Sequence, residues 1–150
     1  MAHFSVRHQE IFFVSKPPAL VKAHFANLET IAAHFGVIDH YEILAPDTLK
    51  VTLPPQKMRN TSFTGVYVSV YTQPSEAVLK WEDGEGANLN SRGEIHFLPK
   101  GAGTEVRYDQ TVELEMPVPK LVAKMIGPMV KHKVKSGITG YIERMRASLQ

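Results

Sequence analysis

The spacing of apolar side chains predicts a strand near the start of the chain, followed by helix. Residues 4–14 alternate between two faces, one of which carries Phe4, Val6, His8, Glu10, Phe12 and Val14. A period of two with β-branched and aromatic side chains is typical of a strand. Pro17-Pro18 ends this pattern, because proline cannot donate to a sheet ladder and suits the first turn of a helix.

Residues 19–35 follow a helical period, with apolar side chains at three- and four-residue steps. We expect this helix to be divided near Asn27 into two short ones and to be closed by Gly36. The next stretch lacks a comparable helical period. Turn signals divide it into six predicted strands, at 37–44, 48–53, 61–72, 76–82, 88–98 and 104–116.

A helical period returns from Pro119 to the end of the chain. The apolar stripe consists of Leu121, Met125, Ile126, Met129, Val130, Val134, Ile138, Tyr141, Met145 and Leu149. We expect Gly127-Pro128 to break this helix early, leaving a short lead-in and a long helix from about 128 to 148. The predicted fold is α+β, with one antiparallel sheet burying its apolar face against this long helix.

Composition narrows the chemistry. At 150 residues, with 43% hydrophobic and 21% charged residues, we expect one globular domain over residues 1–150. The absence of cysteine excludes disulfides, thiolate metal sites and cysteine nucleophiles. A formal net charge of +2 is too small to indicate a nucleic-acid partner.

Charge is unevenly placed along the chain. Residues 76–115 hold nine acidic and four basic side chains, whereas residues 116–150 hold seven basic and one acidic. Two interpretations stay open: both are ordinary solvated surfaces, or the basic helix meets anionic head groups at a membrane surface. The run at 11–14 is too short for a signal peptide or a membrane span, so we expect a cytoplasmic protein without a transmembrane segment.

The order of elements and several local sequences resemble the START-like, or SRPBCC, superfamily. The matching features are the strand running into Pro17-Pro18-Ala19-Leu20-Val21, the Asn27-Leu28-Glu29 step, Trp81 at a strand end, the hairpin at 98–106 and the closing amphipathic helix. This superfamily includes the birch-pollen allergen, START lipid-transfer domains, polyketide cyclases and coenzyme-Q-binding proteins. The resemblance implies a helix-grip fold, in which a curved seven-stranded antiparallel sheet wraps the C-terminal helix around a cavity for a hydrophobic ligand.

Strand phase and the helical stripe then give the candidate ligand-binding residues. These are Tyr41, Leu79, Trp81, Ser91, Ile95, Phe97, Tyr108, Gln110 and Met129, together with His8 and Glu10. Each aromatic residue in this set is equally consistent with ordinary core packing. Methionine likewise suits an adaptable pocket or a gap in the core, and we favour the core.

The polar members of this set require partners if they are buried. Gln110 is the best candidate for a polar anchor. His8 and Glu10, two apart on one strand face, suit an acid/base pair. The alternative, which we favour, is that a bulge near Gln9 reverses the strand phase or that the pair lies at an open sheet end.

No motif assigns a cofactor. The seven histidines lack the four-residue helical spacing of a metal site, and no nucleophile elbow, phosphate loop or dinucleotide fingerprint is present. We therefore predict no metal and no cofactor.

The favoured function is binding of a hydrophobic or amphipathic small molecule, such as a lipid, isoprenoid or polyketide, by a carrier or sensor. The alternatives are an enzyme of the polyketide cyclase or dehydratase kind, in which His8, Glu10, Tyr41 or Gln110 would move protons, and a protein-interaction module with a vestigial cavity.

Overall fold

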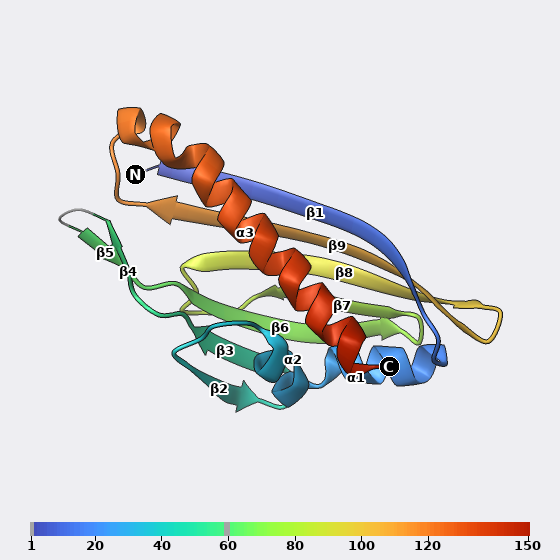
Figure 1. Ribbon diagram of the computed structural model, residues 1–150. Helices are drawn as coiled ribbons and strands as arrows, with labels where there is room; N and C mark the ends of the chain where they lie inside the picture. Colours follow the sequence, from blue (N-terminus) through green and yellow to red (C-terminus); the bar gives the residue numbers. More distant parts are fainter. Residues whose placement is uncertain (1, 59–60) are drawn as a thin grey trace.

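The fold combines one large antiparallel sheet with three helices (Figure 1). The structure is a computed structural model that describes residues 2–58 and 61–150. In chain order the elements are β1 (Ala2–Val14), α1 (Pro18–Ala26), α2 (Leu28–His34), β2 (His40–Ala45), β3 (Thr48–Thr52), β4 (Gln56–Met58), β5 (Thr61–Phe63), β6 (Val66–Ser75), β7 (Val78–Asp83), β8 (Leu89–Lys100), β9 (Gly103–Met116) and α3 (Lys120–Ser148).

Seven of these strands form the predicted sheet, in the order β1-β9-β8-β7-β6-β3-β2. Every neighbouring pair is antiparallel, and β1 pairs with β9 without interruption from Ala2↔Met116 to Val14↔Thr104. The remaining two strands, β4 and β5, form a separate hairpin. The helix-grip architecture and the two short helices after the first strand are therefore confirmed.

The helix α3 crosses one face of the sheet, beginning near the β4–β5 hairpin and ending beside α1 and α2 (Figure 1). Asn27 separates the two short helices as expected, because its side chain caps α2 by accepting a hydrogen bond of 3.0 Å from the Thr30 N–H. His24 of α1 contacts the end of α3, where its Nε2 lies 2.8 Å from Ser148 Oγ.

Three boundaries differ from the sequence prediction. Residues 37–39 lie outside β2, because Gly36 takes a positive φ of 117° and turns the chain before the strand begins. The predicted strand at 61–72 is divided between β5 and β6. The strand break falls at Thr64-Gly65, where Gly65 lies so close to Leu89 that a Cβ would be 2.5 Å from Leu89 Cδ1.

The expected break at Gly127-Pro128 is also wrong, because α3 continues through Pro128. Proline inside a helix removes one hydrogen bond and costs about 3 kcal/mol. Apolar side chains on both sides of Pro128, including Ile126 and Val130, pack against the same cluster of buried residues. This tertiary packing holds the two halves in one helix, which bends after its first turns (Figure 1).

The first part of the apolar stripe on α3 is not core. Leu121, Met125 and Met129 are 76%, 76% and 62% exposed, so the core interpretation holds for Met145 but not for the other two helical methionines. The sheet narrows the choice, since only one side of this part of the helix can face it.

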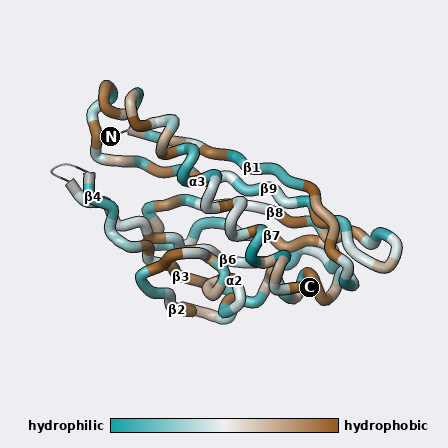
Figure 2. Tube along the Cα trace, in the orientation of Figure 1, coloured by the Kyte–Doolittle hydropathy of each residue, from teal (hydrophilic) through white to brown (hydrophobic). Residues whose placement is uncertain are grey.

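Buried apolar residues form two clusters instead of one continuous core. The larger cluster joins α1, α2 and the end of α3 to the middle of the sheet, and includes Phe25, Phe97 and Ile142. The smaller cluster lies where β1 begins and β9 ends, and includes Phe4 and Leu114. Figure 2 shows hydrophobic positions on both the strands and α3. The space between the clusters is where a cavity can form.

Gly93 provides a test of this packing. A Cβ at Gly93 would overlap the Trp81 ring at Cζ2 and lie 2.7 Å from the Asp109 carbonyl oxygen. We expect Gly93→Ala to lower the free energy of unfolding by about 1–3 kcal/mol in urea titrations, because neither the packed indole nor the backbone can withdraw freely.

Gly137→Ala is the matched control. Gly137 lies in α3 and a Cβ there would meet no atom within 4 Å, so this change should raise stability by up to about 1 kcal/mol through helix propensity. Equal stability of the Gly93→Ala and wild-type proteins would contradict the packing described for Trp81.

Candidate ligand cavity

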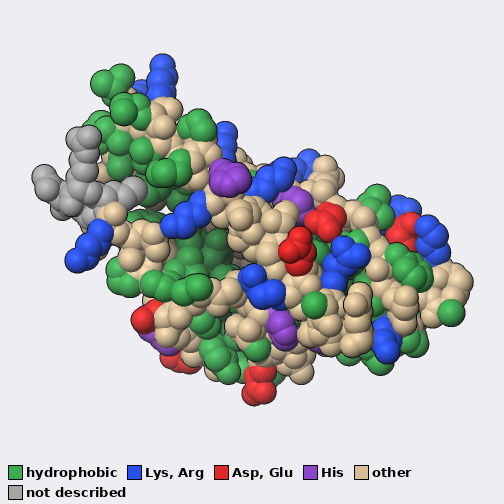
Figure 3. Space-filling model, viewed as in Figure 1, with side chains coloured by type: hydrophobic (Ala, Val, Ile, Leu, Met, Phe, Trp, Pro, Cys, Tyr) green, Lys and Arg blue, Asp and Glu red, His purple; other side chains and the backbone are tan. Residues whose placement is uncertain are grey.

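A cavity of about 750 Å³ lies between the sheet and α3. Its lining includes members of both apolar clusters, such as Phe25 and Ile138 from the larger and Leu114 and Met116 from the smaller. The space-filling view shows a hollow with hydrophobic side chains inside it (Figure 3). Its volume falls within the range of about 300–1,000 Å³ that small-molecule sites occupy.

Aromatic side chains form much of the cavity wall. Trp81 stands between Tyr71 and Tyr108, with ring centroids 5.8 and 5.7 Å away. Nearer the mouth, Phe35 contacts Tyr67 and Tyr141, at 5.4 and 6.3 Å. Such rings offer a large, stiff apolar surface whose faces pack readily against an unsaturated or cyclic ligand.

A chain of polar side chains crosses the sheet inside the cavity. The Tyr108 hydroxyl donates to Gln110 Oε1 at 2.7 Å, and Gln110 Nε2 donates to Ser91 Oγ at 2.9 Å. The Trp81 indole N–H also donates to Ser91 Oγ, at 3.0 Å. Because Ser91 accepts both bonds, its own O–H remains to donate, and the chain is otherwise satisfied without a ligand.

Burial keeps the cavity tyrosines protonated. It raises the pKa of Tyr67 to about 12, and it raises those of Tyr71, Tyr108 and Tyr141 still further above the ordinary value of 10.0. At neutral pH these phenols are therefore uncharged hydrogen-bonding groups within an apolar wall.

No histidine, aspartate or glutamate lines this cavity within the residues described, 2–58 and 61–150. The charged lining residues are Lys57, Lys133 and Arg144. Lys133 Nζ donates to Gln56 Oε1 at 2.9 Å, and Arg144 Nε donates to the His34 carbonyl at 2.8 Å. The site therefore has an apolar, neutral interior with cationic side chains among its lining.

The structure brings most of the predicted ligand-binding residues together. Those that line the cavity are Leu79, Trp81, Ser91, Ile95, Tyr108, Gln110 and Met129. Phe97 is 1% exposed and packs against Phe25 in the core instead, with ring centroids 6.0 Å apart. Tyr41 lies on the edge strand β2, is 46% exposed and is not part of the lining.

His8 and Glu10 also lie apart from the cavity lining. The uninterrupted β1–β9 pairing shows no bulge at Gln9, so both side chains keep the phase of the buried face. His8 is only 8% exposed, and its Nε2 lies 2.9 Å from Glu10 Oε1. Glu10 Oε2 in turn lies 3.9 Å from Arg146 Nη1 of α3, so this group ties the helix to β1.

Sequence reasoning missed several lining residues. Tyr67 and Tyr71 are two of these, and their period-two spacing with Ser69 on one predicted strand was a signal that all three share a face. Gly137 carried no such signal, because only the packed helix shows that its missing side chain leaves open space beside the cavity.

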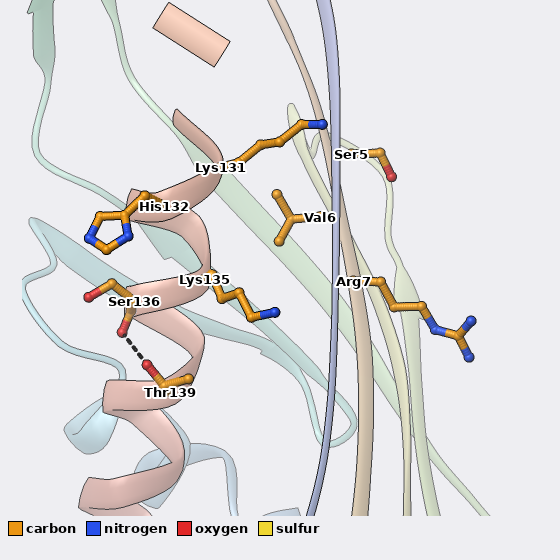
Figure 4. A pocket seen from close by; sticks show the side chains of 8 residues that line it. All are labelled: Ser5, Val6, Arg7, Lys131, His132, Lys135, Ser136 and Thr139. Atoms are coloured by element: carbon orange, nitrogen blue, oxygen red, sulfur yellow. Dashed lines mark hydrogen bonds between the residues drawn. The ribbon is translucent and has the colours of Figure 1, made fainter. Parts of the chain in front are cut away.

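A second, smaller cleft of about 480 Å³ lies between α3 and the edge of β1 (Figure 4). Lys131 and Lys135 extend from the helix toward the strand, whereas Arg7 points away from it. Arg7 donates to both carboxylate oxygens of Asp109, at 3.1 and 2.8 Å. Lysines beside an edge strand are a common protection against unwanted strand pairing.

The chain belongs to the CoxG family of carbon monoxide dehydrogenase subunits, whose family model matches residues 11–145. The START/SRPBCC-like resemblance is confirmed by this match and by solved structures of the same fold. None of the curated protein sequences matches the chain significantly.

The similar solved structures cover nearly the whole chain at low sequence identity. A START superfamily protein from Mycobacterium smegmatis is 18% identical, with a TM-score of 0.69 and coverage of 99% of this chain and 97% of that one. The ZhuI aromatase/cyclase from Streptomyces is 15% identical, with a TM-score of 0.64 and coverage of 99% and 94%. Norcoclaurine synthase from Thalictrum flavum is 11% identical, with a TM-score of 0.63 and coverage of 97% and 94%. At these identities the likeness shows the fold alone.

The raised tyrosine pKa values predict a loss of stability in alkali. Between about pH 10 and 12 the phenols are ionised in the unfolded chain but protonated in the folded protein, so the unfolded state binds fewer protons. The free energy of unfolding must then fall as the pH rises through this window. Urea titrations at several pH values should show a shallower fall for Tyr67→Phe than for the wild type. Tyr41→Phe, at an exposed position, serves as the control, and equal slopes for all three proteins would contradict a low-polarity cavity.

Proposed function

We propose that this protein binds a hydrophobic or amphipathic small molecule in the cavity between sheet and α3, as a carrier or sensor. The observation that carries the proposal is the cavity itself, about 750 Å³ with an aromatic and aliphatic wall and a few neutral hydrogen-bonding groups. Apolar area supplies the affinity for such a ligand, at roughly 25 cal/mol per Å² removed from water, and the polar groups orient it.

The lining favours binding over catalysis. A cyclase or dehydratase needs groups that gain and lose protons near neutral pH, and these are usually histidine or carboxylate side chains. The described lining holds neither, its tyrosines are held neutral, and the candidate pair His8 and Glu10 is engaged at the β1–α3 contact. Gln110, the remaining candidate, has an amide side chain that does not titrate.

A protein partner is compatible with this proposal. The family is named for a component of carbon monoxide dehydrogenase, which favours an accessory role beside an oxidoreductase. A vestigial cavity, as the interaction-module alternative requires, is not favoured by the volume observed. No helix in the described part of the chain is both long and apolar enough to span a membrane.

Filling the cavity tests the proposal directly. Gly137 lies on the cavity-lining face of α3, between Lys133 and Tyr141 one turn away on either side, and has open space around its Cα. We expect Gly137→Phe to weaken saturable binding of an apolar fluorescent probe at least tenfold, because the ring occupies space that the probe needs. Native mass spectrometry of the purified protein should show a lipid-like adduct on the wild type and little or none on this variant.

Gly137→Ala is the control for the change of helix propensity, and it should bind the probe as the wild type does. Thermal unfolding of both variants shows that they are folded. A Gly137→Phe protein that is folded and binds with unchanged affinity would place the probe elsewhere and overturn the proposal.

A further inference from the structure

We infer that the cavity takes an amphiphile with an anionic head group, held at the mouth between Lys57 and Lys133, with its apolar tail inside. The inference rests on the proposed function and specifies its ligand class. Its basis is the placement of charge: cations and no carboxylates among the described residues that line the cavity.

Lys57 and Lys133 approach the same point of the mouth from two elements. Lys133 extends from α3 and donates to Gln56 Oε1 at 2.9 Å, and Lys57 is the next residue after Gln56 on β4. Both lysines are exposed and line the cavity. A head group beside Gln56 would thus meet an ammonium from each side.

These two lysines carry no compensating charge from the protein. In the described residues, Arg7, Lys80, Arg92, Lys100, Arg107 and Arg146 each lie within 4 Å of a carboxylate oxygen. No such ion pair is present at Lys57 or Lys133 in this part of the chain. Their positive charge is therefore free to attract an anion, which the carboxylates elsewhere would repel.

Arg144 marks the other end of the same opening. It lies eleven residues beyond Lys133 on α3, about 16 Å along the helix axis. Its guanidinium holds the His34 carbonyl at 2.8 Å and so contributes to the joint between α2 and α3. One small head group cannot reach both ends, so we assign the anion to the Lys57–Lys133 end.

The interior fits a tail rather than a second charge. The polar chain from Tyr108 through Gln110 to Ser91 satisfies itself, and the tyrosines are neutral. A charged group moved deep into this wall would lose its hydration without a counter-ion, which is costly. An anion at the rim keeps part of its hydration and gains the two ammonium groups.

The experiment compares ligands that share a tail and differ in head group. Oleate and oleyl alcohol compete with the apolar fluorescent probe at about pH 8, where a carboxylic acid is ionised. We expect oleate to bind at least tenfold more tightly than the alcohol at about 0.02 M salt, and the difference to shrink at about 0.5 M salt through screening.

Lys133→Gln should weaken oleate about three- to tenfold and leave the alcohol unchanged, as expected for loss of one charge-assisted contact. Lys57→Gln should do the same. Lys135→Gln removes the same charge from the same helix but faces the second cleft, so its oleate affinity should match that of the wild type.

Two other results overturn the inference. Equal affinities for oleate and the alcohol, with probe binding intact, would leave the proposed function standing and remove the anionic head group. Equal effects of Lys133→Gln and Lys135→Gln would reduce the preference to general surface charge. Absence of saturable probe binding would refute the proposed function itself, and the inference with it.

Discussion

The architecture depends on a mismatch between the width of the sheet and the width of the helix that covers it. Seven strands spaced about 4.8 Å apart span roughly 30 Å, whereas a helix with its side chains is about 10 Å across. A single helix therefore cannot bury the whole apolar face. In this protein α1 and α2 cover one end, α3 crosses the middle, and the uncovered remainder is the cavity.

This mismatch also accounts for the two apolar clusters. Where helices meet the sheet closely, buried side chains such as Phe25, Phe97 and Ile142 fill the space between them. At the other end, the first half of α3 packs against the start of β1 and the end of β9. The polar chain of Tyr108, Gln110 and Ser91 lies on the sheet between these regions. A cavity wall can accommodate such polar side chains, because they hydrogen-bond to each other across neighbouring strands.

Charge has a different role at each place in the molecule. Most surface carboxylates are neutralised across neighbouring strands, as Arg7–Asp109 and Arg92–Glu113 show. The Glu10–Arg146 contact joins β1 to α3 near the larger cluster, where Arg146 also lies over the Phe12 ring, 4.6 Å from its centroid. The cations of the cavity mouth differ from these, because they face an opening that contains no acidic side chain within the described residues.

The sequence alone determined the order of elements, the seven-stranded sheet and the inward face of most strands, because period-two and period-3.6 patterns report directly on which side of an element is buried. It therefore predicted Leu79, Trp81, Ser91, Ile95, Tyr108 and Gln110 as lining residues. Only the tertiary structure decided that Phe97 is core, that Tyr41 lies on an exposed edge and that α3 continues through Pro128. These outcomes depend on how far the helix reaches across the sheet, and no local pattern encodes the distance between two packed elements. For the same reason, the contribution of Gly137 to the cavity and of Lys133 to its mouth became visible only once the helix was in place.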